Sequence, residues 1–366
     1  MYVVTNREVN PRRTGLGVFG ETPNSQGPNE LRLVEVTPQH DGSYETQIID
    51  GKPLTRTEVR DLERRYRLDL DQGQKWYSSL RIACELMRRA SEEKRHLVVF
   101  VHGYNNDMGD VMATAQAIEA LYNVIVVPFS WPANGGGPIS GTAAYLDDKR
   151  DARVSMDALN RFLGKVRLYQ RKLTAARRDE LMAQAREEVG GAGNRLAIQE
   201  RFAHLQSADC QVTLNLLCHS MGAYVLKYAL RPRDAEAAEL IFDNVSLLGA
   251  DTNAEAHEDW VERIQVRNRL YIVINENDSA LAWSRRKPGD EQRARLGHYL
   301  RHLVARNTHY IDVTGADGIG DAHGYYTGGP VTRNAALHGF LAQAFEGGRG
   351  EEGLDYAPDM NAYRLR

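Results

Sequence analysis

Short runs of apolar residues alternate with longer stretches of helical periodicity from residue 97 onward. The runs consist mainly of valine, isoleucine and leucine, as expected of strands that are buried on both faces of a sheet. Strands that alternate with helices in this way form a mostly parallel sheet with helices on both faces, so the pattern predicts an α/β fold. The predicted strands are 97–101, 123–129, 212–218, 244–249, 270–274 and 310–313.

Helical periodicity fills the intervals between the apolar runs. An apolar residue at every third or fourth position predicts a helix over 76–90, ahead of the first parallel strand. Leu296, Tyr299 and Leu300 fall on one face of a helix predicted over 291–304. The other predicted helices are 109–121, 143–172, 223–230 and 332–345.

Three segments depart from this alternation. Residues 31–36 and 44–49, separated by turn residues, predict an antiparallel hairpin at one edge of the sheet. Residues 171–206 are rich in Arg, Glu and Ala and predict two inserted helices, either a cap over the site or a solvated hairpin without a functional part. The division we predict is a main domain at 1–346, with an N-terminal hairpin extension at 1–75 and the insertion at 171–206, followed by a flexible tail at 347–366.

Composition and charge limit the class of protein and its expected location. The chain has 366 residues, 42% hydrophobic and 26% charged, which is typical of a globular protein. No apolar run approaches the roughly 20 residues of a membrane-spanning helix, and the start lacks the apolar stretch of a signal peptide, so we expect a cytoplasmic protein. With 46 basic and 49 acidic residues, the net charge of -3 predicts no nucleic-acid partner. The cysteines, Cys84, Cys210 and Cys218, form no CxxC pair and are expected to be buried thiols.

The sharpest chemical signal is the segment LNLLCHSMGA at 214–223, where an apolar strand runs through H-S-M-G into a helix. A serine on such a tight turn is held in a strained conformation that exposes its hydroxyl, and small neighbours prevent clashes. The pattern predicts a nucleophile elbow at Ser220, with Cys218 at the place of the first glycine in G-x-S-x-G. The alternative is an ordinary turn in which Ser220 caps the helix.

A serine nucleophile needs a base, and the base needs an acid that orients it. In this type of sheet the order along the chain is Ser, Asp or Glu, His, each at the end of a strand. Asp278 follows the strand at 270–274 and His323 follows the strand at 310–313, so we predict them as acid and base. Asp251, one strand earlier, is an alternative acid.

Acyl transfer also needs N–H donors for the negatively charged oxygen. The N–H of Met221, the residue after the serine, is one predicted donor. The loop after the first parallel strand reads H-G-Y-N-N at 102–106, and we assign the second donor to the N–H of Tyr104. Asn105 is predicted to brace this loop and to contact substrate.

Aromatic residues near these loops are candidates for a substrate pocket. Trp131, Tyr325 and Tyr326 could form apolar walls, which favours a lipid-like or aromatic ester, and the glycine-rich loop at 134–138 could form a rim. The alternative for the aromatic residues is partly buried packing.

The remaining histidines are not assigned to chemistry. The side chain of His219 is expected to point away from the substrate. His298 and His302 lie four positions apart on the predicted helix at 291–304 without an acidic helper, so no metal site is predicted.

The combined motifs resemble the bacterial α/β-hydrolases catalogued as a domain of unknown function. The resemblance covers roughly the first 340 residues. It implies an α/β-hydrolase fold with Ser220, Asp278 and His323 as the triad, in agreement with the strand pattern. Its motifs are FVHGYNN at 100–106, FSWP at 129–132, HSMG at 219–222, NDSAL at 277–281 and His323, with TNR at 5–7 and GPNELR at 27–32.

The predicted protein is therefore an α/β-hydrolase with a twisted, mostly parallel sheet of about eight strands and a small helical cap. Its predicted activity is hydrolysis of a small or lipid-like carboxylic ester through an acyl-enzyme, without a cofactor or metal. Thioesterase, amidase and acyltransferase chemistry would use the same triad and stay open. A binding or scaffold module without turnover is a further alternative, because fold alone does not imply function.

Overall fold

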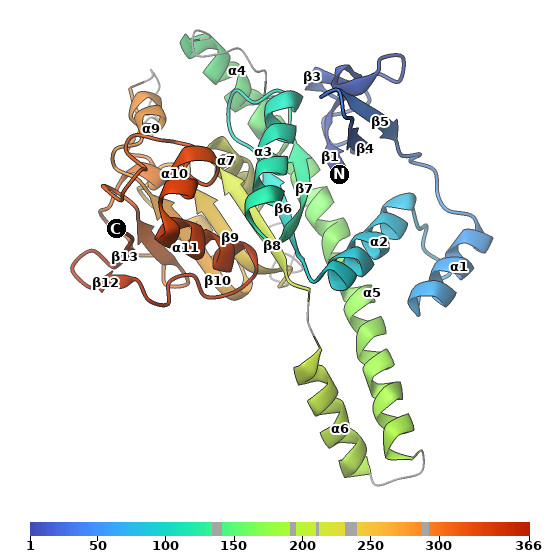
Figure 1. The fold of residues 1–366 in the computed structure, drawn as a ribbon. Helices are drawn as coiled ribbons and strands as arrows, with labels where there is room; N and C mark the ends of the chain where they lie inside the picture. Colours follow the sequence, from blue (N-terminus) through green and yellow to red (C-terminus); the bar gives the residue numbers. More distant parts are fainter. Residues whose placement is uncertain (134–140, 191–194, 210–211, 231–239, 287–292) are drawn as a thin grey trace. The chain divides into compact units, whose positions relative to one another are not determined.

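The computed structural model describes residues 1–133, 141–190, 195–209, 212–230, 240–286 and 293–366 (Figure 1). The chain divides into two compact units. Unit 1 comprises 1–49, 95–163 and 213–366, and unit 2 comprises 50–94 and 164–212. The predicted rim loop at 134–138 lies outside the described residues.

Unit 1 is built on a sheet of eleven strands in the described part of the chain, and eight of them are parallel. Across the sheet the parallel strands are β13 (Ala362–Arg364), β11 (His309–Asp312), β10 (Val266–Ile274), β9 (Phe242–Leu248), β8 (Leu214–His219), β6 (His96–Val101), β7 (Val124–Ser130) and β1 (Tyr2–Thr5). Antiparallel strands extend both edges, β12 (Asp355–Ala357) beside β13, and β4 (Arg32–Pro38) and β5 (Tyr44–Ile48) beyond β1. The strand order reverses at β6, which lies between β7 and β8, and ligands of such sheets bind at the carboxyl ends of strands at this kind of switch point.

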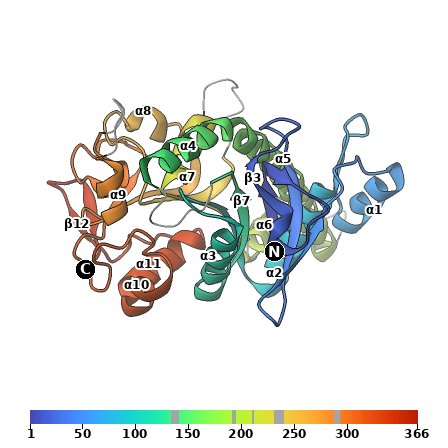
Figure 2. The same cartoon turned by 90° about the horizontal axis from the view of Figure 1, so that it is seen from above.

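Helices of unit 1 cover both faces of the sheet (Figure 2). One face carries α3 (Met108–Leu121), α10 (Gly328–Arg333) and α11 (Ala335–Phe345), and the other carries α4 (Gly141–Val154), α7 (Met221–Ala229) and α8 (Glu258–Val261). Two short elements near the carboxyl ends of the strands are α9 (Ser279–Ser284) and the 3-10 turn η3 (Leu296–His298). A separate hairpin of β2 (Arg7–Val9) and β3 (Phe19–Pro23) contains the 3-10 turn η1 (Gly15–Val18). No helix in the described ranges is long and apolar enough to cross a membrane.

The central strands are apolar because both of their faces are covered by helices. Every residue of β8 is buried, and so is every residue of β6 after His96. On one face, Val98 and Phe100 of β6 pack in one core with Ile118 of α3 and Leu341 of α11. These contacts explain why continuous apolar runs, and not an alternating pattern, mark the parallel strands.

The predicted α/β architecture is confirmed. All six predicted strands form, with ends displaced by at most four residues, and the predicted hairpin is β4 and β5. The parallel strands number eight, close to the size predicted for the whole sheet, and three antiparallel strands are added at its edges. β1 escaped prediction because its four residues, YVVT, are too few to show a period.

The helix predicted over 291–304 is wrong in its described part, 293–304, where η3 is the one helical turn. The Leu296 N–H donates to the Thr252 carbonyl at 2.8 Å, and a side chain on Gly297 would lie 2.3 Å from the Ala250 nitrogen. The segment therefore packs backbone to backbone against the loop that follows β9. Its apolar spacing reflects burial of an irregular chain, which the sequence pattern alone did not distinguish from a helix.

The flexible tail predicted at 347–366 is also wrong. β13 pairs in parallel with β11, Leu365 donates its N–H to the Asp312 carbonyl at 2.9 Å, and its side chain is 1% exposed. Glycine and charge dominate the composition of this segment, and a strand of three residues cannot show a period against that background.

Unit 2 is helical. It consists of α1 (Arg56–Tyr66), α2 (Ser78–Glu93), the part of α5 (Met156–Val189) from residue 164, and α6 (Arg195–Ala208). Its core joins Trp76 and Leu80 to Tyr169 and Ala176 of α5. The two inserted helices form, and Ala176 of the first shares this core with Leu62 and Leu68, which the sequence analysis placed in the N-terminal extension. Their role as a cap stays a prediction.

Candidate active site

Ser220 lies on the turn between β8 and α7, with φ +52° and ψ -120°. Residues other than glycine rarely adopt this conformation, and such strain is concentrated at functional sites. The Ser220 side chain makes no capping hydrogen bond to α7, which disfavours the interpretation as an ordinary helix cap. The backbone fixes the turn instead, since the Ser220 N–H donates to the Leu248 carbonyl at 3.0 Å and its carbonyl accepts from the Asp251 N–H at 3.1 Å.

Two glycines make room for this turn. A side chain on Gly222 would lie 2.4 Å from the Val101 carbonyl oxygen, and one on Gly103 would lie 2.9 Å from the Ser220 Cβ. Cys218 fits in place of the usual first glycine because it points into the core, where it is fully buried. Burial raises the pKa of its thiol, so Cys218 stays a neutral packing residue. Cys84 is likewise free and buried, whereas Cys210 lies outside the described residues.

His323 and Asp278 form a direct pair. His323 Nδ1 lies 2.6 Å from Asp278 Oδ2, within a strong hydrogen bond. The Asp278 side chain is fully buried, whereas 22% of the His323 side chain is exposed. Asp278 also accepts from the Leu281 N–H at 3.0 Å, which fixes its carboxylate at the start of α9. A carboxylate accepts only, so Nδ1 carries the proton and Nε2 of His323 has a free lone pair.

Hydrogen bonds tie the loop that carries His323 to the loop that carries the acid. Asn275 Nδ2 donates to the Ala322 carbonyl at 3.3 Å, and the Ser279 N–H donates to the Asp321 carbonyl at 3.1 Å. The position of His323 therefore depends on a side-chain contact from Asn275 and a backbone contact from Ser279, on either side of Asp278.

Gly249 packs directly against the histidine. Its φ is +52°, and a side chain there would lie 3.1 Å from His323 Cε1. The Gly249 N–H donates to the Tyr325 hydroxyl at 3.0 Å, and this hydroxyl donates to the Val273 carbonyl at 3.2 Å. Tyr325 is 0% exposed and was predicted to bind substrate. The structure corrects that prediction, because the phenol braces two loops and presents no surface to a ligand.

Ser220 and His323 are both held against the Leu248–Gly249 segment. No hydrogen bond joins the Ser220 hydroxyl to the His323 ring among the described residues, although the contacts of such groups commonly tighten only when substrate binds. His219, which precedes Ser220 in the chain, contacts His323. Its Nε2 donates to the His323 carbonyl at 3.2 Å, and the centroids of the two imidazole rings lie 4.4 Å apart. Burial and the neighbouring His323 hold the pKa of His219 well below its usual value.

The loop after β6 carries the predicted second donor, Tyr104. Asn105 has φ +58°, and its N–H donates to Asp148 Oδ2 at 3.1 Å, so its backbone braces this loop. The His102 ring at the start of the loop is fully buried, with Nδ1 2.9 Å from the Gly103 carbonyl oxygen.

Trp131 stands behind this loop. It is 0% exposed, its indole N–H donates to the His102 carbonyl at 2.9 Å, and its ring stacks on the imidazole at 5.2 Å. Tyr326 is 3% exposed and packs on His219. The prediction that Trp131 lines a substrate pocket is therefore wrong, and burial of these aromatic rings removes the sequence argument for a lipid-like or aromatic substrate.

The alternative acid, Asp251, has a different partner. Its Oδ1 lies 3.0 Å from Arg295 Nε and accepts from the Ser284 hydroxyl at 2.8 Å, and the side chains of Asp251 and Arg295 are each 3% exposed. Of the two acids considered, Asp278 is therefore the one that the structure places against His323.

Sequence reasoning missed Arg7. The Arg7 side chain is 2% exposed and donates to the Asn106 carbonyl, in the loop of Tyr104, at 2.9 Å. Arg7 lies in the T-N-R segment at 5–7, whose one signal in the sequence is the family resemblance. No spacing or periodicity marks it, because its partners Asn106, Ser130 and Ala133 are more than 90 positions away along the chain.

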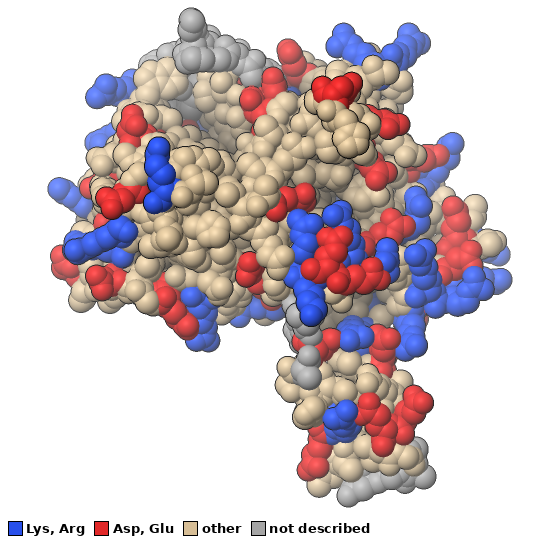
Figure 3. Space-filling model, in the orientation of Figure 1, with Lys and Arg blue, Asp and Glu red and all other residues tan. Residues whose placement is uncertain are grey.

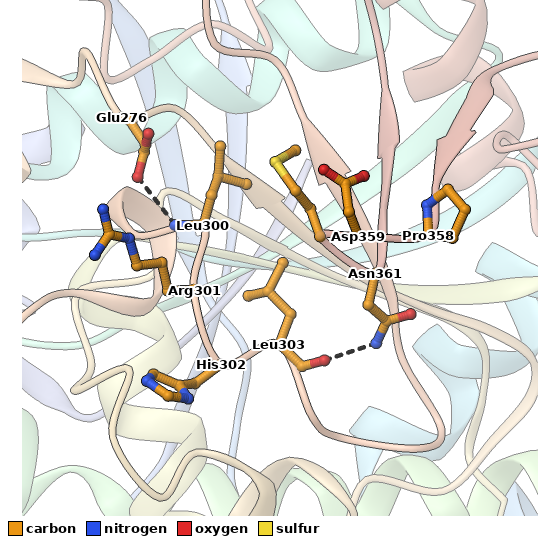
Figure 4. Close-up of a pocket in the computed structure, with 9 residues that line it drawn as sticks. Glu276, Leu300, Arg301, His302, Leu303, Pro358, Asp359 and Asn361 are labelled. Carbon is orange, nitrogen blue, oxygen red and sulfur yellow. Dashed lines mark hydrogen bonds between the residues drawn. The ribbon is translucent and has the colours of Figure 1, made fainter.

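The two cavities described on the surface do not contain the candidate catalytic residues. Cavities of about 520 and 560 Å³ both border residues 301–302, and neither contains Ser220, Asp278 or His323. In the first, Glu276 accepts from the Leu300 N–H and Asn361 donates to the Leu303 carbonyl (Figure 4). No cluster of three or more metal-binding side chains occurs among the residues that could be searched. Acidic and basic side chains are interspersed on the face shown in Figure 3.

The chain belongs to a family of α/β-hydrolases. The family model described as "Alpha/beta hydrolase of unknown function (DUF900)" matches residues 82–175 and 179–320. Ser220 and Asp278 lie inside the matched ranges, and His323 lies three residues beyond them. Comparisons with curated proteins and with solved structures gave no match.

Proposed function

We propose that this α/β-hydrolase is a serine esterase that cleaves a carboxylic ester through an acyl-enzyme, with Ser220 as nucleophile, His323 as base and Asp278 as orienting acid. The observation that carries the proposal is the strained serine turn beside a histidine that is hydrogen-bonded to a fully buried carboxylate. Among the described residues no Lys or Arg forms an ion pair with Asp278, so burial of its carboxylate is costly, and the hydrogen bond to His323 supplies a reason to retain it.

The proposed reaction follows from the tautomer of His323. The Ser220 oxygen attacks the ester carbonyl carbon while Nε2 of His323 accepts the hydroxyl proton, and Asp278 stabilises the resulting imidazolium. The N–H groups of Met221 and Tyr104 bind the oxyanion. The bond to the leaving alcohol breaks as His323 returns the proton to it, and water then attacks the acyl-enzyme by the same route to release the acid.

Labelling with a fluorophosphonate tests this proposal, because such probes react with activated serines. The purified protein should be labelled at Ser220. The variants S220A and H323A should lose labelling, and turnover of short p-nitrophenyl esters should fall by about 10⁴-fold or more. Peptide mapping of the labelled site and circular dichroism of each variant are the controls. A folded wild-type protein that stays unlabelled would contradict the proposal and favour a module that binds without turnover.

A further inference from the structure

We propose that Arg7 is a positioning residue that holds His102 and the loop 102–106 so that the Tyr104 N–H faces the oxyanion. The role of that N–H rests on the proposed function.

The donor and the His102 contact belong to one peptide group. The carbonyl of Gly103 and the N–H of Tyr104 lie in the same plane and point in opposite directions, because a peptide bond is planar and almost always trans. His102 Nδ1 lies 2.9 Å from the Gly103 oxygen. A hydrogen bond there fixes the direction of the Tyr104 N–H and polarises the group, which strengthens this N–H as a donor.

The partners of His102 decide its tautomer. The backbone N–H of Trp131 can only donate and lies 3.2 Å from Nε2, so Nε2 must accept and cannot carry a proton. Nδ1 faces a carbonyl oxygen, which can only accept, so Nδ1 carries the proton. Burial first, and then the positive charge of Arg7, lower the pKa of His102 to about 3, which keeps the ring neutral.

Arg7 bridges the two ends of the loop. Its Nε donates to the Ser130 hydroxyl at 2.9 Å, and this oxygen lies 3.4 Å from His102 Nε2. Its Nη2 donates to the carbonyls of Asn106 and Ala133, at 2.9 and 3.0 Å. The fork of the guanidinium matches these fixed acceptors in a way that a single ammonium group cannot.

The charge of Arg7 is expensive to bury. Burial lowers its pKa to about 10, so it stays a cation at neutral pH, and Asp148 provides the largest opposing attraction. Asp148 also accepts from the Asn105 N–H, so cation and anion act on adjacent residues of one loop. A buried cation bound mostly by carbonyls costs free energy of solvation, and orientation of this loop accounts for its presence.

The test compares R7K, which keeps the charge and loses the fork, with R269K as the matched control. Arg269 lies on β10 and bonds to Glu351, outside the proposed site. In R7K, the fluorophosphonate labelling rate and kcat for a short p-nitrophenyl ester should fall by about 10- to 100-fold, with KM changed less than about threefold, because a transition-state donor is displaced. R269K should lower the melting temperature and leave kcat unchanged.

Two further readouts keep the test decisive if R7K folds poorly. S130A removes the link between Arg7 and His102 without removing the charge and should lower kcat in the same direction. The ¹⁵N spectrum of histidine-labelled wild-type protein should show a neutral His102 ring protonated at Nδ1, and a ring protonated at Nε2 would overturn the inference.

Each outcome bears on a different claim. Wild-type protein that is not labelled at Ser220 overturns the proposed function and this inference with it. Labelled wild type together with folded R7K and S130A at the wild-type kcat overturns the inference alone. A rise of KM at constant kcat also overturns it, because a displaced oxyanion donor acts on the transition state.

Discussion

Replacement of Gly249 tests whether close packing against His323, the proposed base, is needed for activity. A control glycine with a positive φ but no such contact accounts for backbone strain. Alanine at this position would combine an unfavourable φ of +52° with a contact of 3.1 Å to His323 Cε1. We expect G249A to displace the imidazole and to lower kcat and the labelling rate by about 100-fold, since small misplacements of a catalytic group have effects of that size.

The matched control is G315A. Gly315 also has a positive φ, +76°, but no atom lies within 4 Å of the side chain that alanine would add. This variant should lose about 1 kcal/mol of stability and keep its labelling rate. Equal loss of labelling in both variants would show that strain, not contact with His323, is responsible.

The choice of acid is a second test at the residue scale. D278N should lower kcat by about 10⁴-fold, because an amide in place of the carboxylate favours the wrong tautomer of the histidine. D251N removes the ion pair with Arg295 and should lower the melting temperature while retaining labelling. Ester turnover and thermal unfolding of the two variants separate these effects, and the reverse result would assign the acid to Asp251.

At the scale of elements, prediction from sequence succeeded where burial was complete. β6 and β8 are covered on both faces, so their apolar runs stand out, and the serine turn lies directly at the end of β8. Prediction failed where the fold depends on contacts that local sequence does not encode. Leu296 is held by Thr252 in an irregular segment, and β13 exists because β11 offers it an edge.

The same reason explains the errors at the candidate site. The positions of Ser220, Asp278 and His323 relative to strand ends were predictable, because chain order and strand ends define them. The burial of Trp131 and Tyr325 was not, since an aromatic residue beside a site loop has the same local sequence whether it faces a ligand or supports the loop.

The carboxyl-terminal strands provide a prediction of stability. Leu365 follows β13 and is 1% exposed, so L365A should lower the free energy of unfolding by about 2–5 kcal/mol. R366A, at the exposed neighbouring position, should change it by less than about 0.5 kcal/mol. Urea unfolding of both variants checks this, and equal stabilities would contradict the buried placement of the final strand.

At the scale of the whole molecule, neutral buried histidines link stability to pH. Burial lowers the pKa of His102 to about 3, and the pKa of His219 is lowered as well. Below the unfolded-state value of about 6.5 the unfolded chain takes up protons that the folded chain does not, so stability is present above that pH and is lost as the pH falls.

Each such histidine should cost about 1.4 kcal/mol per pH unit between pH 6.5 and its folded-state pKa. Urea unfolding at pH 7 and pH 5 should therefore show a large loss for the wild type and a smaller one for H102Q, whose side chain does not titrate. A wild-type profile that is flat between these pH values would show that His102 and His219 are charged in the folded protein.

β1 lies between β7 and β4, and Arg7 lies two residues after its end, at the start of β2. The first strand of the chain can pair with β7 only after more than a hundred further residues have been synthesised, and long-range pairing of this kind is slow. The loop that carries Tyr104 is thus completed by the earliest part of the chain at a late stage of folding. During refolding, secondary structure should return before reactivity toward the probe, so the probe reports completion of the sheet and not mere collapse of the chain.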